Sequence, residues 1–191
     1  MTVCIFASSS SRIDNEYSLA AGELGKLLAE AGMDVVFGGG GIGLMGRLAD
    51  SVLSNNGSIT GVIPGFMKEE GWDHHGVTKM IVTHDMGERK RQMFALADAV
   101  VALPGGVGTL EELTEAITLK QLGLFKGSII ILNTRGFYNT LIRFLEELID
   151  GQFLRFEHKG IWQLASTPEE AVGLLLKNEP WIHDPRSIAK I

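Results

Sequence analysis

One short segment constrains the fold of this chain more than any other: a buried apolar run that ends in a proline and a glycine-rich turn. Residues 99–103 read Ala-Val-Val-Ala-Leu, which is typical of a strand in a parallel sheet with helices on both faces. Pro104 ends the predicted strand, because proline offers no ladder donor. Three of the next four residues are glycines, which allow a sharp turn and a close approach to a ligand: Gly105, Gly106 and Gly108.

A helix is predicted to begin directly after this turn. Thr109 occupies the expected N-cap position, and Glu112 follows three residues later in a capping-box pattern. A helix start behind a glycine turn presents free N–H groups and a partial positive charge, which suits a phosphate. The alternative is a cap with no ligand, as we expect for the similar pattern at 167–170. The run of glycines favours the phosphate site, since a purely structural cap does not need it.

Strands and helices are predicted to alternate along the whole chain with short connections. This pattern indicates βαβ units, and so a doubly wound, mainly parallel α/β sheet with helices on both faces. We expect a single domain over 1–191, with an extended tail at 178–191 and an irregular segment at 66–76. Predicted strands cover 3–7, 33–37, 59–63, 79–83, 99–103, 128–132 and 161–164, and predicted helices cover 14–31, the segment from 46 to 55, 87–96, 109–122, 138–149 and 168–176.

Composition excludes several classes of function. The formal net charge of −6 argues against a broad nucleic-acid surface, which needs clustered cations. Cys4 is the single cysteine, so no internal disulfide can form. The five histidines show no metal-ligand spacing. There is no signal-peptide pattern and no apolar run long enough to span a bilayer, so we expect a cytoplasmic protein without a membrane partner.

A second glycine run at 38–46 fits G-x-G-x-x-G in two registers, but neither standard nucleotide motif is complete. A dinucleotide site needs an acidic residue after the next strand, and that strand ends in Ile63-Pro64-Gly65. A phosphate-binding Walker loop needs lysine after its last glycine, and Gly46 is followed by Arg47. What remains is a site for one phosphate or one nucleotide, without Mg²⁺ chemistry.

A basic helix places two cations beside an apolar stripe. Met86, Met93 and Ala97 share one face at the helical period, and Arg89 and Lys90 flank it. One interpretation is that their alkyl stems cover apolar surface while the charges reach water. The other is that they reach into the crevice at the carboxyl ends of the strands and bind an anion or a sugar.

Three motifs together resemble the Lonely Guy family, the cytokinin riboside 5′-monophosphate phosphoribohydrolases that are often mislabelled as lysine decarboxylases. These are Gly-Gly-Gly-x-x-Gly-Leu-Met-Gly at 38–46, Glu-Arg-Lys at 88–90 and Pro-Gly-Gly-x-Gly-Thr-x-x-Glu at 104–112, within a resemblance that covers 3–176. The resemblance implies a Rossmann-like homodimer without metal or organic cofactor. It implies hydrolysis of the N-glycosidic bond of a purine nucleoside 5′-monophosphate, of cytokinin or adenosine type, to free base and ribose 5-phosphate.

The resemblance also implies which residues form the site. The family's catalytic arginine and glutamate fall on Arg89 and Glu112. Its substrate-binding positions fall on Gly105, Gly106, Gly108, Thr109, Lys90, Thr118 and Glu70. For Glu70 the match is less direct, because the loop that carries it differs in length from that of the family. The chain departs from the family pattern at Gly87, where histidine is usual, at Leu119, where tryptophan is common, and near Ala7, where the first loop usually has glycine. These departures concern base specificity more than reaction type.

Cleavage of a ribosyl–purine bond develops oxocarbenium character on the sugar, which a nearby carboxylate can stabilise while it orients water. We assign this role to Glu112 and expect the helix start to keep it ionised. Arg89 would orient Glu112 and hold substrate hydroxyls or phosphate. The rival hypothesis is a carrier that binds a nucleotide or the molybdenum cofactor without catalysis. A pyridoxal-dependent decarboxylase is disfavoured, because no lysine has a suitable Schiff-base context.

Overall fold

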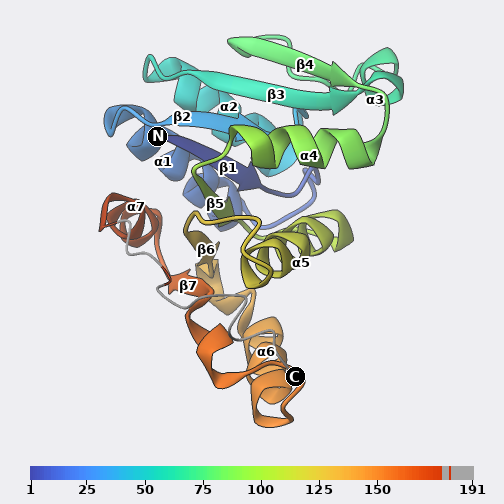
Figure 1. Ribbon diagram of the computed structural model, residues 1–191. Coiled ribbons are helices and arrows are strands. Elements are labelled where there is room, and N and C mark those ends of the chain that lie inside the picture. Colours follow the sequence, from blue (N-terminus) through green and yellow to red (C-terminus); the bar gives the residue numbers. More distant parts are fainter. Residues whose placement is uncertain (178–180, 182–191) are drawn as a thin grey trace.

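In the computed structural model, which describes residues 1–177 and 181, a seven-stranded parallel sheet forms the centre of the molecule (Figure 1). Its order is β4-β3-β2-β1-β5-β6-β7, and every neighbouring pair is parallel. The sheet confirms the predicted doubly wound α/β class. The strands are β1 (Thr2–Phe6), β2 (Asp34–Phe37), β3 (Ile59–Pro64), β4 (Lys79–Thr83), β5 (Ala99–Ala102), β6 (Ile129–Leu132) and β7 (Trp162–Ala165).

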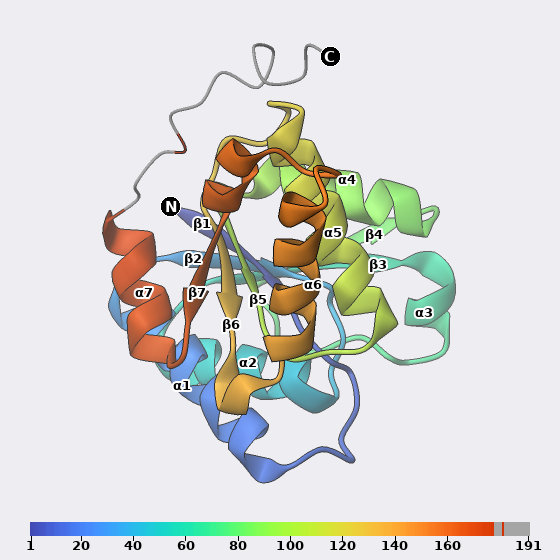
Figure 2. The ribbon, with the colours of Figure 1, turned by 90° about the horizontal axis from the view of Figure 1, so that it is seen from below.

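Helices cover both faces of the sheet (Figures 1 and 2). Buried residues of α1, α2 and α7 form one apolar cluster with the sheet, and those of α4, α5 and α6 form the other. The helices are α1 (Asn15–Glu30), α2 (Gly43–Ser54), α3 (Gly65–Glu69), α4 (Met86–Leu96), α5 (Val107–Gln121), α6 (Asn139–Asp150) and α7 (Pro168–Lys177), with 3₁₀ turns η1 (Thr134–Gly136) and η2 (Phe156–Gly160). Among the described residues, no helix combines the length and apolarity that a membrane span requires.

Burial on both faces explains the composition of the central strands. Every residue of β5 and β6 is buried, which is why both strands are continuous apolar runs rather than alternating ones. The helix α4 differs, because its buried residues are Met93 and a cation, Arg89. A buried arginine requires polar partners, and the site described below provides them.

The order of the strands reverses between β1 and β5. These two strands are paired with Ile5 opposite Val101 and Phe6 opposite Ala102, and they lead into α1 and α5 on opposite faces of the sheet. A crevice therefore opens beyond their carboxyl ends, at the position where ligands bind in open α/β sheets.

Two local predictions are wrong. The helix α5 begins at Val107 with Gly106 as its N-cap, and no side chain caps it. Thr109 is therefore the third helical residue and not the cap, because the extended Gly106 (φ −84°, ψ −159°) lets the helix start sooner. The segment predicted as irregular, 66–76, contains part of α3, which starts from the extended Pro64. The predicted tail at 178–191 lies outside the described residues except for Trp181.

Candidate active site

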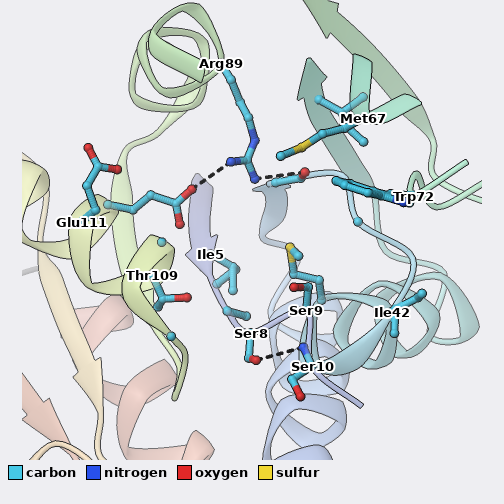
Figure 3. A pocket seen from close by; sticks show the side chains of 18 of the residues that line it. Ile5, Ser8, Ser9, Ser10, Ile42, Met67, Trp72, Arg89, Thr109 and Glu111 are labelled. Carbon is cyan, nitrogen blue, oxygen red and sulfur yellow. Dashed lines mark hydrogen bonds and ion pairs between the residues drawn. The ribbon is translucent and has the colours of Figure 1, made fainter. Parts of the chain in front are cut away.

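A pocket of about 640 Å³ lies at the reversal point of the sheet. That volume is within the range of small-molecule sites. One wall comes from the start of α5 and the other from the β1–α1 loop, α2 and α3. Figure 3 shows Arg89 reaching between Thr109 and Glu111 on one side and Met67 and Trp72 on the other.

Arg89 is held by three polar partners at the base of the pocket. Its Nε donates to the Val62 carbonyl at 3.0 Å and its Nη2 to the Gly38 carbonyl at 3.1 Å. Its Nη1 donates to Glu112 Oε1 at 3.2 Å. Only 7% of Arg89 is exposed. The interpretation in which its charge reaches bulk water is therefore wrong, and the side chain turns into the crevice.

Gly38 makes this position of the guanidinium possible. A Cβ atom at residue 38 would lie 1.8 Å from Arg89 Nη2. Any other residue would therefore displace the arginine. The first glycine run thus contributes to the site by accommodating Arg89, in addition to lining the pocket with Gly38 and Gly40.

Glu112 is a buried carboxyl in the second turn of α5. It is 7% exposed, and loss of hydration raises its pKa to about 7, against the opposing effect of Arg89. The helix start therefore does not hold the pKa of this residue in the usual carboxyl range, contrary to expectation. Since α5 begins at Val107, Glu112 lies beyond the first turn, where the helix dipole is weak.

The start of α5 presents backbone donors to the pocket. Gly106, Gly108 and Thr109 line it, and the first-turn N–H groups are available because α5 has no side-chain cap. Gly105 lies behind them, where a Cβ would approach Thr109 Oγ1 to 2.1 Å. The glycine turn that was predicted to bind phosphate therefore faces the same pocket as Arg89 and Glu112.

Lys90 does not line the pocket. It pairs with Glu111 and, at 2.7 Å, with Glu115 of α5, so its charge is engaged by carboxylates. Glu111 itself lines the pocket, and sequence reasoning did not select it. Its position beside Glu112 in the 104–112 motif was the available signal.

Two further predicted substrate contacts lie outside the lining of this pocket. Glu70 is an exposed residue at the end of α3. Thr118 is exposed, and its hydroxyl donates to the Thr114 carbonyl at 2.8 Å. The assignment of both residues to substrate binding stays a prediction.

The opposite wall was expected to include the first glycine run, but most of its side chains were not selected from sequence. The β1–α1 loop contributes Ser8, Ser9 and Ser10. An apolar part is formed by Ile42, Met45, Ile63, Met67, Trp72 and Met86. Hydrogen bonds of 2.9 Å from Gly41 N to Trp72 O and from His74 N to Gly39 O hold the Trp72 segment against the first glycine run. The pocket thus combines an anion-binding end with an apolar surface.

No group of three or more His, Cys, Asp or Glu side chains in residues 1–177 and 181 is arranged to hold a metal ion. The lining residues with hydroxyl or charged side chains include three serines, one threonine, two glutamates and Arg89.

Comparisons of the sequence with a family model and with individual proteins point to one family. A family model described as "possible lysine decarboxylase" matches residues 45–175. The cytokinin riboside 5′-monophosphate phosphoribohydrolase LOG7 of Arabidopsis thaliana is 38% identical over 178 residues, covering 93% of this chain and 82% of that protein. The enzyme LOG of Oryza sativa subsp. japonica, which carries the same activity in its name, is 38% identical over 180 residues, covering 94% and 73%.

Solved structures share the architecture. The X-ray structure of the structural-genomics target TM1055 superposes with a TM-score of 0.73 at 26% identity, covering 92% of this chain and 98% of that one. The molybdenum cofactor carrier protein of Chlamydomonas reinhardtii superposes with a TM-score of 0.71 at 21% identity, covering 92% and 95%. At that identity the carrier shows a common fold and nothing about function.

Proposed function

This chain belongs to the Lonely Guy family of phosphoribohydrolases, and from that premise we propose how its own residues hydrolyse the N-glycosidic bond of purine nucleoside 5′-monophosphates. The enzyme is an N-glycosyl hydrolase that releases a free base and ribose 5-phosphate. One observation carries the assignment of residues. Arg89 and Glu112 form a buried pair 3.2 Å apart, and both line the pocket that the uncapped start of α5 faces.

In the proposed mechanism the 5′-phosphate binds the N–H groups of Gly106, Gly108 and Thr109, with Gly105 shaping the turn. The phosphate does not react, and its binding energy positions the sugar. The bond from the anomeric carbon to the base breaks with its electron pair moving to the base. Water adds to the anomeric carbon and gives a proton to the Glu112 carboxylate, while the base takes a proton from solvent. Arg89 keeps the carboxylate oriented.

The decarboxylase description of the family does not fit this pocket. Pyridoxal chemistry needs a lysine that forms a Schiff base with the cofactor. No lysine lines the pocket in the described part of the chain, and Lys90, which flanks it, is paired with Glu111 and Glu115. The Arg89–Glu112 pair that lines the pocket favours hydrolysis instead.

Chromatography of the products tests the proposed function. The protein is incubated with AMP and, separately, with isopentenyladenosine monophosphate. We expect free base and ribose 5-phosphate in equal amounts from at least one of them. Recovery of both nucleotides intact, with the ligand bound to the protein, would support the carrier hypothesis and overturn the hydrolase.

We predict that kcat/KM rises with pH and levels off above about 7. The reason is that burial raises the pKa of Glu112 to about 7, and the ionised carboxylate is the form that accepts a proton. The same shift lowers the free energy of unfolding as pH rises from 4.5 to about 7, because the folded state binds more protons there.

Initial rates of base release between pH 5 and 9 check this prediction. The substrate phosphate titrates at ~6 and affects every variant alike. The pH profile of the residual activity of Glu112→Gln is therefore the control. If kcat/KM of that variant also rises near pH 7, the titration belongs to another group.

We also propose that the chain forms a homodimer in the cytoplasm and has no nucleic-acid partner. In support of a dimer, Leu96, Leu122 and Leu124 are 40%, 55% and 73% exposed at the ends of α4 and α5 and in the loop that follows. Light scattering is expected to give twice the chain mass of 20.7 kDa. A monomer mass would contradict the dimer.

A further inference from the structure

The β6–α6 loop, residues 133–138, lines no part of the pocket and yet is bonded to the two segments that carry its walls, at Leu103 before the glycine turn and at Asp14 after the serines. It leaves the carboxyl end of β6, beside β5, and lies next to the start of α1 (Figure 2). Its internal hydrogen bonds are numerous for six residues. Tyr138 N donates to Asn133 Oδ1 at 2.7 Å, and Gly136 N donates to the Asn133 carbonyl at 3.0 Å. The loop is therefore a rigid support and not a free connection.

Tyr138 connects this loop to the glycine turn. Its hydroxyl donates to the Leu103 carbonyl at 2.6 Å, and the side chain is 1% exposed. Burial raises the pKa of Tyr138, so the hydroxyl stays a neutral donor at working pH. Leu103 directly precedes Pro104 and the glycines. The bond thus fixes the carbonyl from which the predicted phosphate-binding turn departs.

Arg135 connects the same loop to the serine wall. Its Nη1 lies 2.6 Å from Asp14 Oδ2 and its Nε 3.2 Å from Glu16 Oε2. Asp14 ends the β1–α1 loop and caps α1 by accepting a hydrogen bond from Glu16 N at 3.0 Å. Arg135 has φ of 55°, a conformation that costs free energy for a residue with a side chain. The loop keeps this conformation while it holds Asp14.

The two walls also touch each other between these anchors. Ser8 N donates to the Pro104 carbonyl at 3.3 Å. We propose that the β6–α6 loop sets the spacing between the phosphate-binding turn and the serine loop, with Tyr138 and Arg135 as positioning residues for the substrate. This inference rests on the proposed function, because the substrate is what spans the two walls. A small displacement of either wall is costly when both must contact one ligand.

The variant Tyr138→Phe tests the first anchor, since it removes one hydroxyl and keeps the ring. We expect the KM for AMP and the Kd for ribose 5-phosphate to rise about tenfold, with little change in kcat, because without this bond the glycine turn can shift away from the position in which its N–H groups meet the phosphate. The kcat/KM for adenosine should be unchanged. Tyr17→Phe is the matched control, because it removes the chain's other phenol and keeps the ring that packs on Phe137.

The variant Arg135→Asn tests the second anchor, because asparagine tolerates positive φ and lacks the charge. We expect the KM for AMP to rise about threefold to tenfold, less than for Tyr138→Phe because the ion pair is half-exposed. Arg143→Asn is the matched control, since Arg143 is on the exposed side of α6 beside Glu147.

Binding of ribose 5-phosphate, measured by calorimetry, separates this inference from the proposed function. If the parent binds ribose 5-phosphate but releases no base from AMP, the proposed function fails and the Kd comparison still decides the inference. If Tyr138→Phe and Arg135→Asn lower the melting temperature but leave Kd and KM at parental values, the loop is merely structural and the inference is overturned. A parent that does not bind ribose 5-phosphate would overturn it as well.

Discussion

Replacing Glu112 with glutamine is expected to lower the turnover of AMP by about 10²–10⁴-fold, the usual contribution of a positioned proton acceptor. Glutamine has the same size and can still accept the hydrogen bond that Arg89 Nη1 now donates to Glu112. It cannot take a proton from water or stabilise positive charge on the sugar. The loss should therefore fall on kcat, measured as adenine release at saturating AMP.

Two comparisons make this result specific to Glu112. The variant Glu111→Gln changes a neighbouring carboxyl that also lines the pocket, and a much smaller loss is expected because Glu111 is paired with Lys90. The melting temperature of Glu112→Gln above pH 7 should not fall below that of the parent, since burial already disfavours the charged form of Glu112. Release of adenine at the parental rate by Glu112→Gln would contradict the assignment.

Removing the 5′-phosphate from the substrate is the second large effect. We expect kcat/KM for adenosine to be about 10²–10⁴-fold below that for AMP. Two charge-assisted hydrogen bonds from backbone N–H groups, worth about 1.5–3 kcal/mol each, account for a factor of this size. Steady-state rates with the two substrates under the same conditions measure it.

The glycine turn offers a matched pair of variants for this prediction. In Gly105→Ala the new Cβ would lie 2.1 Å from Thr109 Oγ1, so the turn must shift, whereas Gly173→Ala in α7 meets no atom within 4 Å. We expect the first variant to lose much of the preference for AMP over adenosine and the second to keep it. Equal rates for adenosine and AMP in the parent would contradict the phosphate site.

The central part of the fold and of the site could be predicted because the signals are local. A continuous apolar strand followed by a proline and glycines places a turn at the carboxyl edge of a parallel sheet. The glycine turns after β2 and β5 lie at the same carboxyl edge of the sheet, on either side of β1. Arg89 of α4 and Glu112 of α5 meet in the pocket at this edge.

The remaining features depend on tertiary contacts that a sequence does not display. The helix α5 begins at Val107 because of the backbone conformation of Gly106, so the capping-box pattern at Thr109 was misleading. Burial raises the pKa of Glu112, and burial is a property of the assembled pocket. The close contact of Gly38 with Arg89 joins residues 51 positions apart. None of these follows from residue spacing.

The position of Trp72 in the apolar wall of the pocket also depends on tertiary contacts. Trp72 belongs to a segment with no regular pattern, and it reaches the pocket because its carbonyl accepts a hydrogen bond from Gly41 N. The family resemblance implied that Lys90 contacts the substrate, and its helical position left that open. Pairing with Glu111 and Glu115 on the neighbouring helix decides where its side chain lies.

A crystal structure of Glu112→Gln with bound AMP tests the central claim most directly, because this variant should hold the nucleotide intact. The account predicts that the phosphate contacts the N–H groups of Gly106, Gly108 and Thr109. It also predicts that the side chain of residue 112 lies beside the anomeric carbon. A phosphate bound elsewhere, or residue 112 turned away from the sugar and bonded only to its own helix, would contradict the account.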